Sequence, residues 1–143
     1  MPIILVRHAS AGSRRSWRGD DRLRLLDDKG RAQAEGLVEV LEIYRVTRVV
    51  TSPYSRCLET VAPLARRLGL PIEERAELAE GAGAAVALAL LEEVAAETAV
   101  LCTHGDVMSA LIGPERESKK GSTWILEPAG SGFTPTAYLP PPA

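Results

Sequence analysis

Apolar runs rich in valine and isoleucine alternate along the chain with longer segments in which apolar residues recur every three or four positions. The runs "IILVR" (residues 3–7), "TRVVTS" (47–52) and "TAVLCT" (98–103) predict buried strands. Strands that alternate with helices are typical of an α/β domain. We therefore expect a three-layer α/β/α fold with a mostly parallel central sheet.

The first helical segment is "DDKGRAQAEGLVEVLEIY", residues 27–44. A period of 3.6 places one set of apolar side chains near one face: Ala32, Leu37, Val40, Leu41 and Tyr44. Asp27 or Asp28 can cap its start. We expect that face to lie against the sheet.

The later segments are less regular. Residues 55–69 predict a helix that contains Pro63 and closes on Gly69, and residues 71–78 predict a weak edge strand and a loop. Further on we expect a helix at about 84–96, a short helix over 106–113 and a late strand over 121–128 that could be antiparallel. Residues 1–139 are expected to form a single domain, and the proline-rich residues 140–143 a disordered tail.

Composition narrows the class of protein. With 143 residues, 45% hydrophobic and 25% charged, the chain is predicted to be one soluble globular domain. A net charge of -2 and an aromatic content of 4% argue against a nucleic acid polymer as the main partner. No signal peptide or membrane span is indicated at the start, so we expect a cytoplasmic protein without membrane contact. Cys57 and Cys102 are expected to be small buried residues.

Polar side chains follow each of the three convincing strands. In open α/β sheets, ligands bind beyond the carboxyl ends of the strands, so these side chains should share one rim. Two arginines and two histidines on that rim predict a site for a phosphate dianion, which guanidinium groups bind with paired hydrogen bonds. The residues are Arg7 and His8 after the first strand, Ser52 and Arg56 after the second, and Thr103 and His104 after the third.

A histidine adds chemistry that arginine lacks. A neutral imidazole can attack phosphorus and form a phosphohistidine, which water later hydrolyses. Flanking guanidinium charge disfavours the imidazolium form, and it also stabilises the transferring phosphoryl group, so we expect no metal and no cofactor. The helix that starts at "HGDV" (104–107) presents free amides, including that of Gly105, which favour an anion.

Three stretches carry the residues named above, in this order along the chain: "LVRHA" near the start, "TSPYSRCLET" in the middle and "LCTHGD" late. Together they resemble the histidine phosphatase superfamily, which has the phosphoglycerate mutase-like fold, over about residues 3–127. The resemblance implies that His8 is the phosphorylated nucleophile, that Arg7, Arg56 and His104 form the phosphate pocket, and that Ser52 shapes the loop that delivers Arg56. It places the general acid in "ELAEG", at Glu80 or, failing that, Glu77.

Between Arg56 and His104 there is little more than helix, loop and helix. The chain therefore lacks the large cap insertion of the mutases, and we expect a shallow site. This resembles the small phosphohistidine phosphatase branch, and also a domain that follows a Nudix hydrolase in some bacterial proteins. No Nudix signature is present in the sequence given, which predicts a stand-alone form.

The segment "SRRSWRGDDR" (residues 13–22) directly follows the nucleophile. Arg14, Arg15 and Arg18 around Trp17 could bind a second phosphate and stack a base, as a nucleotide substrate would require. The alternative is a solvated loop in which Trp17 covers the edge of the core.

The sequence thus predicts a metal-independent phosphatase that works through phosphohistidine on His8. The substrate stays open between a phosphohistidine protein, a nucleoside phosphate and a small sugar or acid phosphate. A non-catalytic phospholigand-binding or regulatory module is the alternative, and a phosphomutase is less favoured because no segment closes the site. The oligomeric state is not predicted.

Overall fold

The computed structural model of the chain describes residues 1–142. Within them, six strands form one sheet in the order β3-β2-β4-β1-β5-β6. The strands are β1 (Ile3–Arg7), β2 (Arg48–Thr51), β3 (Ile72–Glu74), β4 (Ala99–Thr103), β5 (Thr123–Ala129) and β6 (Gly132–Leu139). Strands β1 to β4 are parallel, β5 runs antiparallel to them, and β6 runs antiparallel to β5. The predicted mostly parallel sheet is therefore confirmed.

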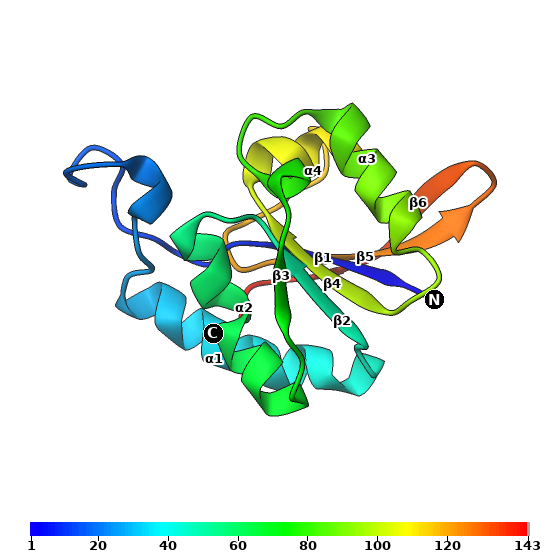
Figure 1. Ribbon diagram of the computed structural model, residues 1–143, viewed down its shortest axis with the longest axis horizontal. Coiled ribbons are helices and arrows are strands. Elements are labelled where there is room, and N and C mark those ends of the chain that lie inside the picture. The colour runs from blue at the N-terminus through cyan, green and yellow to red at the C-terminus, as the bar shows by residue number, and fades with distance from the viewer. Residues whose placement is uncertain (143) are drawn as a thin grey trace.

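Helices cover both faces of this sheet, α1 and α2 on one side and α3 and α4 on the other (Figure 1). The α-helices are α1 (Asp28–Leu41), α2 (Ser55–Leu68), α3 (Ala84–Glu93) and α4 (Gly105–Ile112), and the short 3-10 helices are η1 (Asp21–Leu23), η2 (Glu42–Tyr44) and η3 (Ala76–Leu78). The three-layer fold without a large cap is as predicted.

The alternation of side chains along each strand produces two hydrophobic cores. On β1, Ile4 and Val6 pack toward α1 and α2, while Ile3 and Leu5 pack toward α3 and α4. A smaller apolar cluster of Ala9, Ala11, Leu26 and Ala34 closes the base of the loop that leaves β1. The strands that carry the polar residues are thereby held from both faces.

The buried face of α1 differs partly from the prediction. Asp27 caps the helix by accepting a hydrogen bond from the Gly30 amide at 2.8 Å, and Leu37 and Leu41 are buried as expected. Ala32 is exposed, however, because the helix turns Ala34 and Val38 toward the core instead. The helix also ends at Leu41, three residues before the predicted end, and a 3-10 turn follows.

The C-terminal region differs more. The first helix of the other layer, α3, ends at Glu93 and not at residue 96. Strand β6 was not predicted, since it contains Pro135, which cannot donate to a ladder; Pro135 fits because β6 is the edge strand and the register shifts there. Pro142 lies against α1, where a Cβ on Gly36 would meet it at 2.5 Å, and the disordered tail over residues 140–143 stays a prediction. Residue 143 lies outside the described residues.

Candidate active site

The carboxyl ends of β1 and β4 lie side by side and hold the first two site residues. Arg7 is the last residue of β1, in register with Thr103 of β4. The His8 amide donates to the Thr103 carbonyl at 3.0 Å, and the Gly121 amide donates to the carbonyls of Arg7 and His8 at 3.2 and 3.0 Å. The backbone of both residues is therefore fixed by neighbours on each side.

The imidazole of His8 is held as a neutral ring with one free nitrogen. Nδ1 lies 2.8 Å from the carbonyl oxygen of Ala9, which can only accept, so Nδ1 carries the proton and the lone pair is on Nε2. Burial is the largest cause that lowers the pKa of His8 to about 3; the hydrogen bond to Ala9 opposes it, and His104, Arg56 and Arg7 lower the pKa further. Burial is therefore a stronger cause of neutrality than the flanking guanidinium charge that the sequence suggested.

Arg56 belongs to the first turn of α2, and its guanidinium is completely buried. Its Nη2 lies 3.1 Å from Oε2 of Glu80 and 3.2 Å from Oδ2 of Asp21, and Nη1 donates to the Asp21 carbonyl at 2.8 Å. Its Cζ also lies 4.9 Å from the centre of the Tyr54 ring. Two carboxylates thus balance this buried charge, a feature the sequence did not indicate for Asp21.

Arg7 is positioned by two contacts. Its Nη1 donates to the Ser118 carbonyl at 2.6 Å, and its guanidinium packs over Gly105 at the start of α4. Burial lowers the pKa of Arg7 from its usual value, and Asp106 opposes that change. The absence of a side chain at Gly105 therefore leaves room for the Arg7 guanidinium.

His104 is aligned by Ser52. Its Nε2 lies 2.9 Å from Oγ of Ser52 and 3.6 Å from Sγ of Cys57, and its ring meets those of Tyr54 and His8 edge to face, at 4.7 and 5.3 Å between centres. Oγ of Ser52 also accepts from the Tyr54 amide at 3.3 Å. Ser52 thus braces both the loop before α2 and the second histidine.

Several buried nitrogens at this point make no hydrogen bond to any described residue. They are Nε of Arg7, Nε of Arg56 and Nδ1 of His104. Buried polar atoms without a partner are rare in folded proteins. Three of them from three different elements around His8 are suited to the oxygens of one bound oxyanion.

The two candidate acids lie in different surroundings. Oε2 of Glu80 lies 3.0 Å from Nη2 of Arg14 and 3.8 Å from Nδ1 of His104, beside the site. Glu77 instead forms an ion pair with Arg75 at 2.6 Å, and Arg75 also binds Glu93 of α3. The position of Glu80 beside the site therefore favours it over Glu77 as the candidate general acid.

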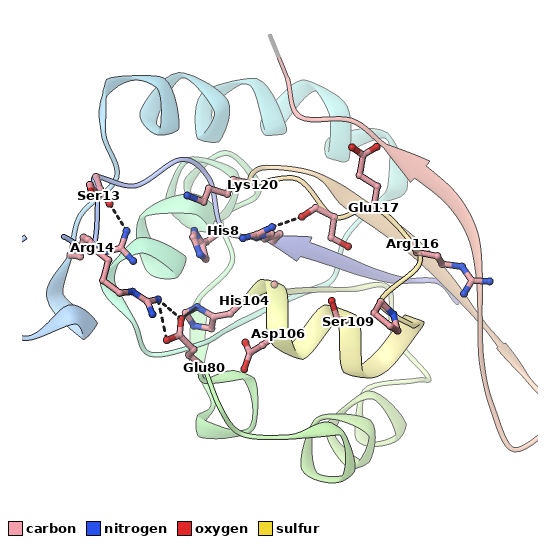
Figure 2. Close-up of a pocket in the computed structure, with 16 residues that line it drawn as sticks. His8, Ser13, Arg14, Glu80, His104, Asp106, Ser109, Arg116, Glu117 and Lys120 are labelled. Carbon is pink, nitrogen blue, oxygen red and sulfur yellow. Dashed lines mark hydrogen bonds and ion pairs between the residues drawn. The ribbon is translucent and has the colours of Figure 1, made fainter. Parts of the chain in front are cut away.

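A cavity of about 1050 Å³ opens above His8 and His104 (Figure 2). It is far larger than a phosphate group needs, and its walls come from the loop after β1, the start of α4 and the segment before β5. Its lining includes Arg7, Gly12, Ser13, Arg14, Arg24, Glu80, Gly105, Asp106, Ser109, Pro114, Arg116, Glu117, Ser118 and Lys120.

The loop after the nucleophile contributes less than predicted. Arg14 lines the cavity, but Arg18 is exposed outside it, and Trp17 is half-buried beside its own loop, where Nε1 donates to the Asp20 carbonyl at 2.9 Å. The structure does not bring Arg18 or Trp17 to the cavity. Arg24 and Lys120, which the sequence analysis did not select, do line it.

Neither residue gave a usable signal in the sequence. Arg24 stands in a charged stretch that is typical of a solvated loop, and Lys120 follows another lysine.

Among residues 1–142, no group of three or more His, Cys, Asp or Glu side chains is arranged to hold a metal ion. No helix in the same part of the chain combines the length and apolar character needed to cross a bilayer.

Comparison with known proteins identifies the family. The sequence model of the histidine phosphatase superfamily (branch 1) matches residues 3–87. An 8-oxo-(d)GTP phosphatase of Mycolicibacterium smegmatis is 38% identical over 155 residues, which cover 98% of this chain and 48% of that protein. The chain thus spans about half the length of this curated relative. It belongs to the histidine phosphatase superfamily.

Solved structures agree on the fold. The protein histidine phosphatase SixA, in complex with tungstate, superposes with a TM-score of 0.81 at 19% identity, over 97% of this chain and 96% of that one. A phosphoserine phosphatase mutant from Entamoeba histolytica gives 0.77 at 12% identity, over 96% of each chain. The predictions of the superfamily and the fold are confirmed.

Proposed function

We propose that this phosphatase hydrolyses its substrate through a phosphohistidine on His8. The observation that carries the proposal is the state of the His8 ring, which is neutral, with Nδ1 bound to the Ala9 carbonyl and the Nε2 lone pair free. Arg7, Arg56 and His104 surround it as donors for the phosphoryl oxygens.

In the first step, Nε2 of His8 attacks phosphorus while the bond to the leaving oxygen breaks, and Glu80 donates a proton to that oxygen. In the second, Glu80 takes a proton from water as the water oxygen attacks phosphorus, which releases phosphate and restores neutral His8. Oε2 of Glu80 lies 3.1 Å from Nη2 of Arg56, so the carboxyl is beside the phosphoryl group that Arg56 would bind.

For the substrate, we propose a nucleotide phosphate. Support comes from the 38% identity with an 8-oxo-(d)GTP phosphatase and from a cavity large enough for more than one phosphate. Ser52 and the Gly105 amide would support the phosphate pocket, and Arg14 would contact the part of the substrate beyond it. A role for Arg18 and Trp17 in stacking a base stays a prediction, and it requires the loop to move toward the cavity.

The test is phosphate release from 4-nitrophenyl phosphate with a chelator present, for the wild type, His8→Ala and the exposed control Arg15→Ala. We expect turnover and an alkali-stable, acid-labile phosphoenzyme in the wild type and in Arg15→Ala, and neither in His8→Ala. Hydrolysis that persists in His8→Ala would overturn the proposal. Tight phosphate binding without turnover of any phosphate compound would favour the non-catalytic binding module instead.

A further inference from the structure

Arg24 is a buried arginine that faces the cavity from outside the phosphate pocket. Only 5% of it is exposed, its Nε lies 2.8 Å from Oδ1 of Asp21, and its Nη1 donates to the Gly12 carbonyl. Its other terminal nitrogen, Nη2, has no hydrogen-bond partner among residues 1–142. The side chain is therefore fixed in place with one donor still available.

Lys120 approaches the same cavity from the opposite segment, just before β5, and points toward His8 (Figure 2). Its backbone is held close to the nucleophile because the next amide, of Gly121, donates to the carbonyls of Arg7 and His8. In the described part of the chain, no carboxylate lies within 4.0 Å of its ammonium group. Burial, Arg7 and Arg24 lower the pKa of Lys120, which reflects the concentration of positive charge around it.

The other charges that line the cavity already have partners within the protein. Lys120 differs from them because it has no carboxylate partner in the described part of the chain, and Arg24, although paired with Asp21, differs because its side chain is 6% exposed, against 62% for Arg14 and 41% for Arg116. The satisfied pairs are Arg14 with Glu80, Arg116 with Glu115, Glu117 with Lys119, and Asp106 with the Gly81 amide.

We propose that Arg24 and Lys120 form a second anion subsite, which binds the inner phosphate of a substrate that ends in a diphosphate. The inference rests on the proposed function, because it places the terminal phosphate at His8. Nε2 of His8 then attacks the terminal phosphorus, the bond to the bridging oxygen breaks, and that oxygen leaves with the inner phosphate. Since a phosphate is a good leaving group, this substrate depends less on proton donation by Glu80 than an alkyl phosphate does.

The experiment compares kcat/KM for ADP with kcat/KM for 4-nitrophenyl phosphate in the wild type, Lys120→Met, Arg24→Gln and the control Lys119→Met. Lys119 is adjacent to Lys120, exposed and paired with Glu117, so it tests the loss of a charge alone. We expect the ratio of ADP to 4-nitrophenyl phosphate to fall about tenfold in Lys120→Met and Arg24→Gln, the size of one lost charged hydrogen bond. The control should keep the wild-type ratio.

An equal fall for both substrates, or an unchanged ratio in Lys120→Met, overturns the subsite. Should Arg24→Gln fail to fold, the Lys120→Met variant still decides the question, because Lys120 is exposed.

If the wild type hydrolyses neither compound, the proposed function fails, and calorimetry with inorganic pyrophosphate and orthophosphate tests the subsite separately. The wild type and Lys119→Met should bind pyrophosphate about tenfold more tightly than orthophosphate, and Lys120→Met should lose that preference. Equal affinities in the wild type would overturn it.

Discussion

A Cβ on Gly105 would lie 2.9 Å from Cζ of Arg7 and 3.1 Å from its Nε, closer than real side chains allow. Gly105→Ala must therefore displace the guanidinium from its place beside His8. Because a small misplacement of a group that binds the transferring phosphoryl is costly, we expect kcat/KM to fall about tenfold to a hundredfold in this variant. Steady-state kinetics on an aryl phosphate measures the loss.

The matched control is Gly132→Ala at the start of β6, where an added Cβ meets nothing within 4 Å. It should keep wild-type kinetics. Thermal unfolding of both variants separates a displaced arginine from a destabilised fold. Wild-type activity in a folded Gly105→Ala protein would contradict the role given to this contact.

Arg14 crosses from the loop after β1 to Glu80, with 3.0 Å between Nη2 and Oε2. The arginine is largely exposed, so solvent screens the pair and its loss should be modest. We expect Arg14→Ala to raise KM about two- to fivefold, while Arg15→Ala leaves KM unchanged, because Arg15 is exposed and does not line the cavity. Michaelis curves for the best substrate provide the test, and equal effects of the two substitutions would show that only loop charge matters.

Glu80 and Glu77 differ in position by three residues but face different partners. If Glu80 donates the proton, Glu80→Gln should slow hydrolysis of an alkyl phosphate about a hundredfold and that of an aryl phosphate much less, because only the alkoxide needs the proton. Glu77→Gln loses an ion pair with Arg75 and should leave both rates unchanged. Rates for the two leaving groups in both variants check this. A uniform loss in Glu80→Gln would assign it to binding alone.

The chemistry of the site could be predicted because it depends on strand ends. Apolar runs that stop at Arg7, Thr51 and Thr103 identify the rim, and parallel register brings those ends together whatever the loops do. Ion pairs across loops have no such periodicity. Ala11 and Leu26 form an antiparallel bridge, and the path of residues 12–25 between them is set by loop folding. That path decides that Asp21 pairs with Arg56 and that Arg24 turns inward.

The same distinction explains the missed strand. The late hairpin of β5 and β6 carries a proline and a register shift, so its hydrophobic alternation is broken just where the prediction needs it. The error in the predicted buried face of α1 has another cause. Ala32 and Ala34 are equally apolar, and only the packing of Ala34 against Ala9 and Leu26 selects one of them for the core.

Finally, the buried neutral His8 should make the protein less stable in acid. Its folded pKa of about 3 lies below the usual 6.5, so between these values the unfolded chain binds a proton that the folded chain does not, and stability falls as pH falls. From pH 7 to pH 5 this amounts to about 2 kcal/mol. Urea unfolding at both pH values should show the wild type losing that much more than His8→Gln, which cannot titrate at this position. Parallel losses in the two proteins would mean that His8 is protonated in the folded state and is not held neutral for attack.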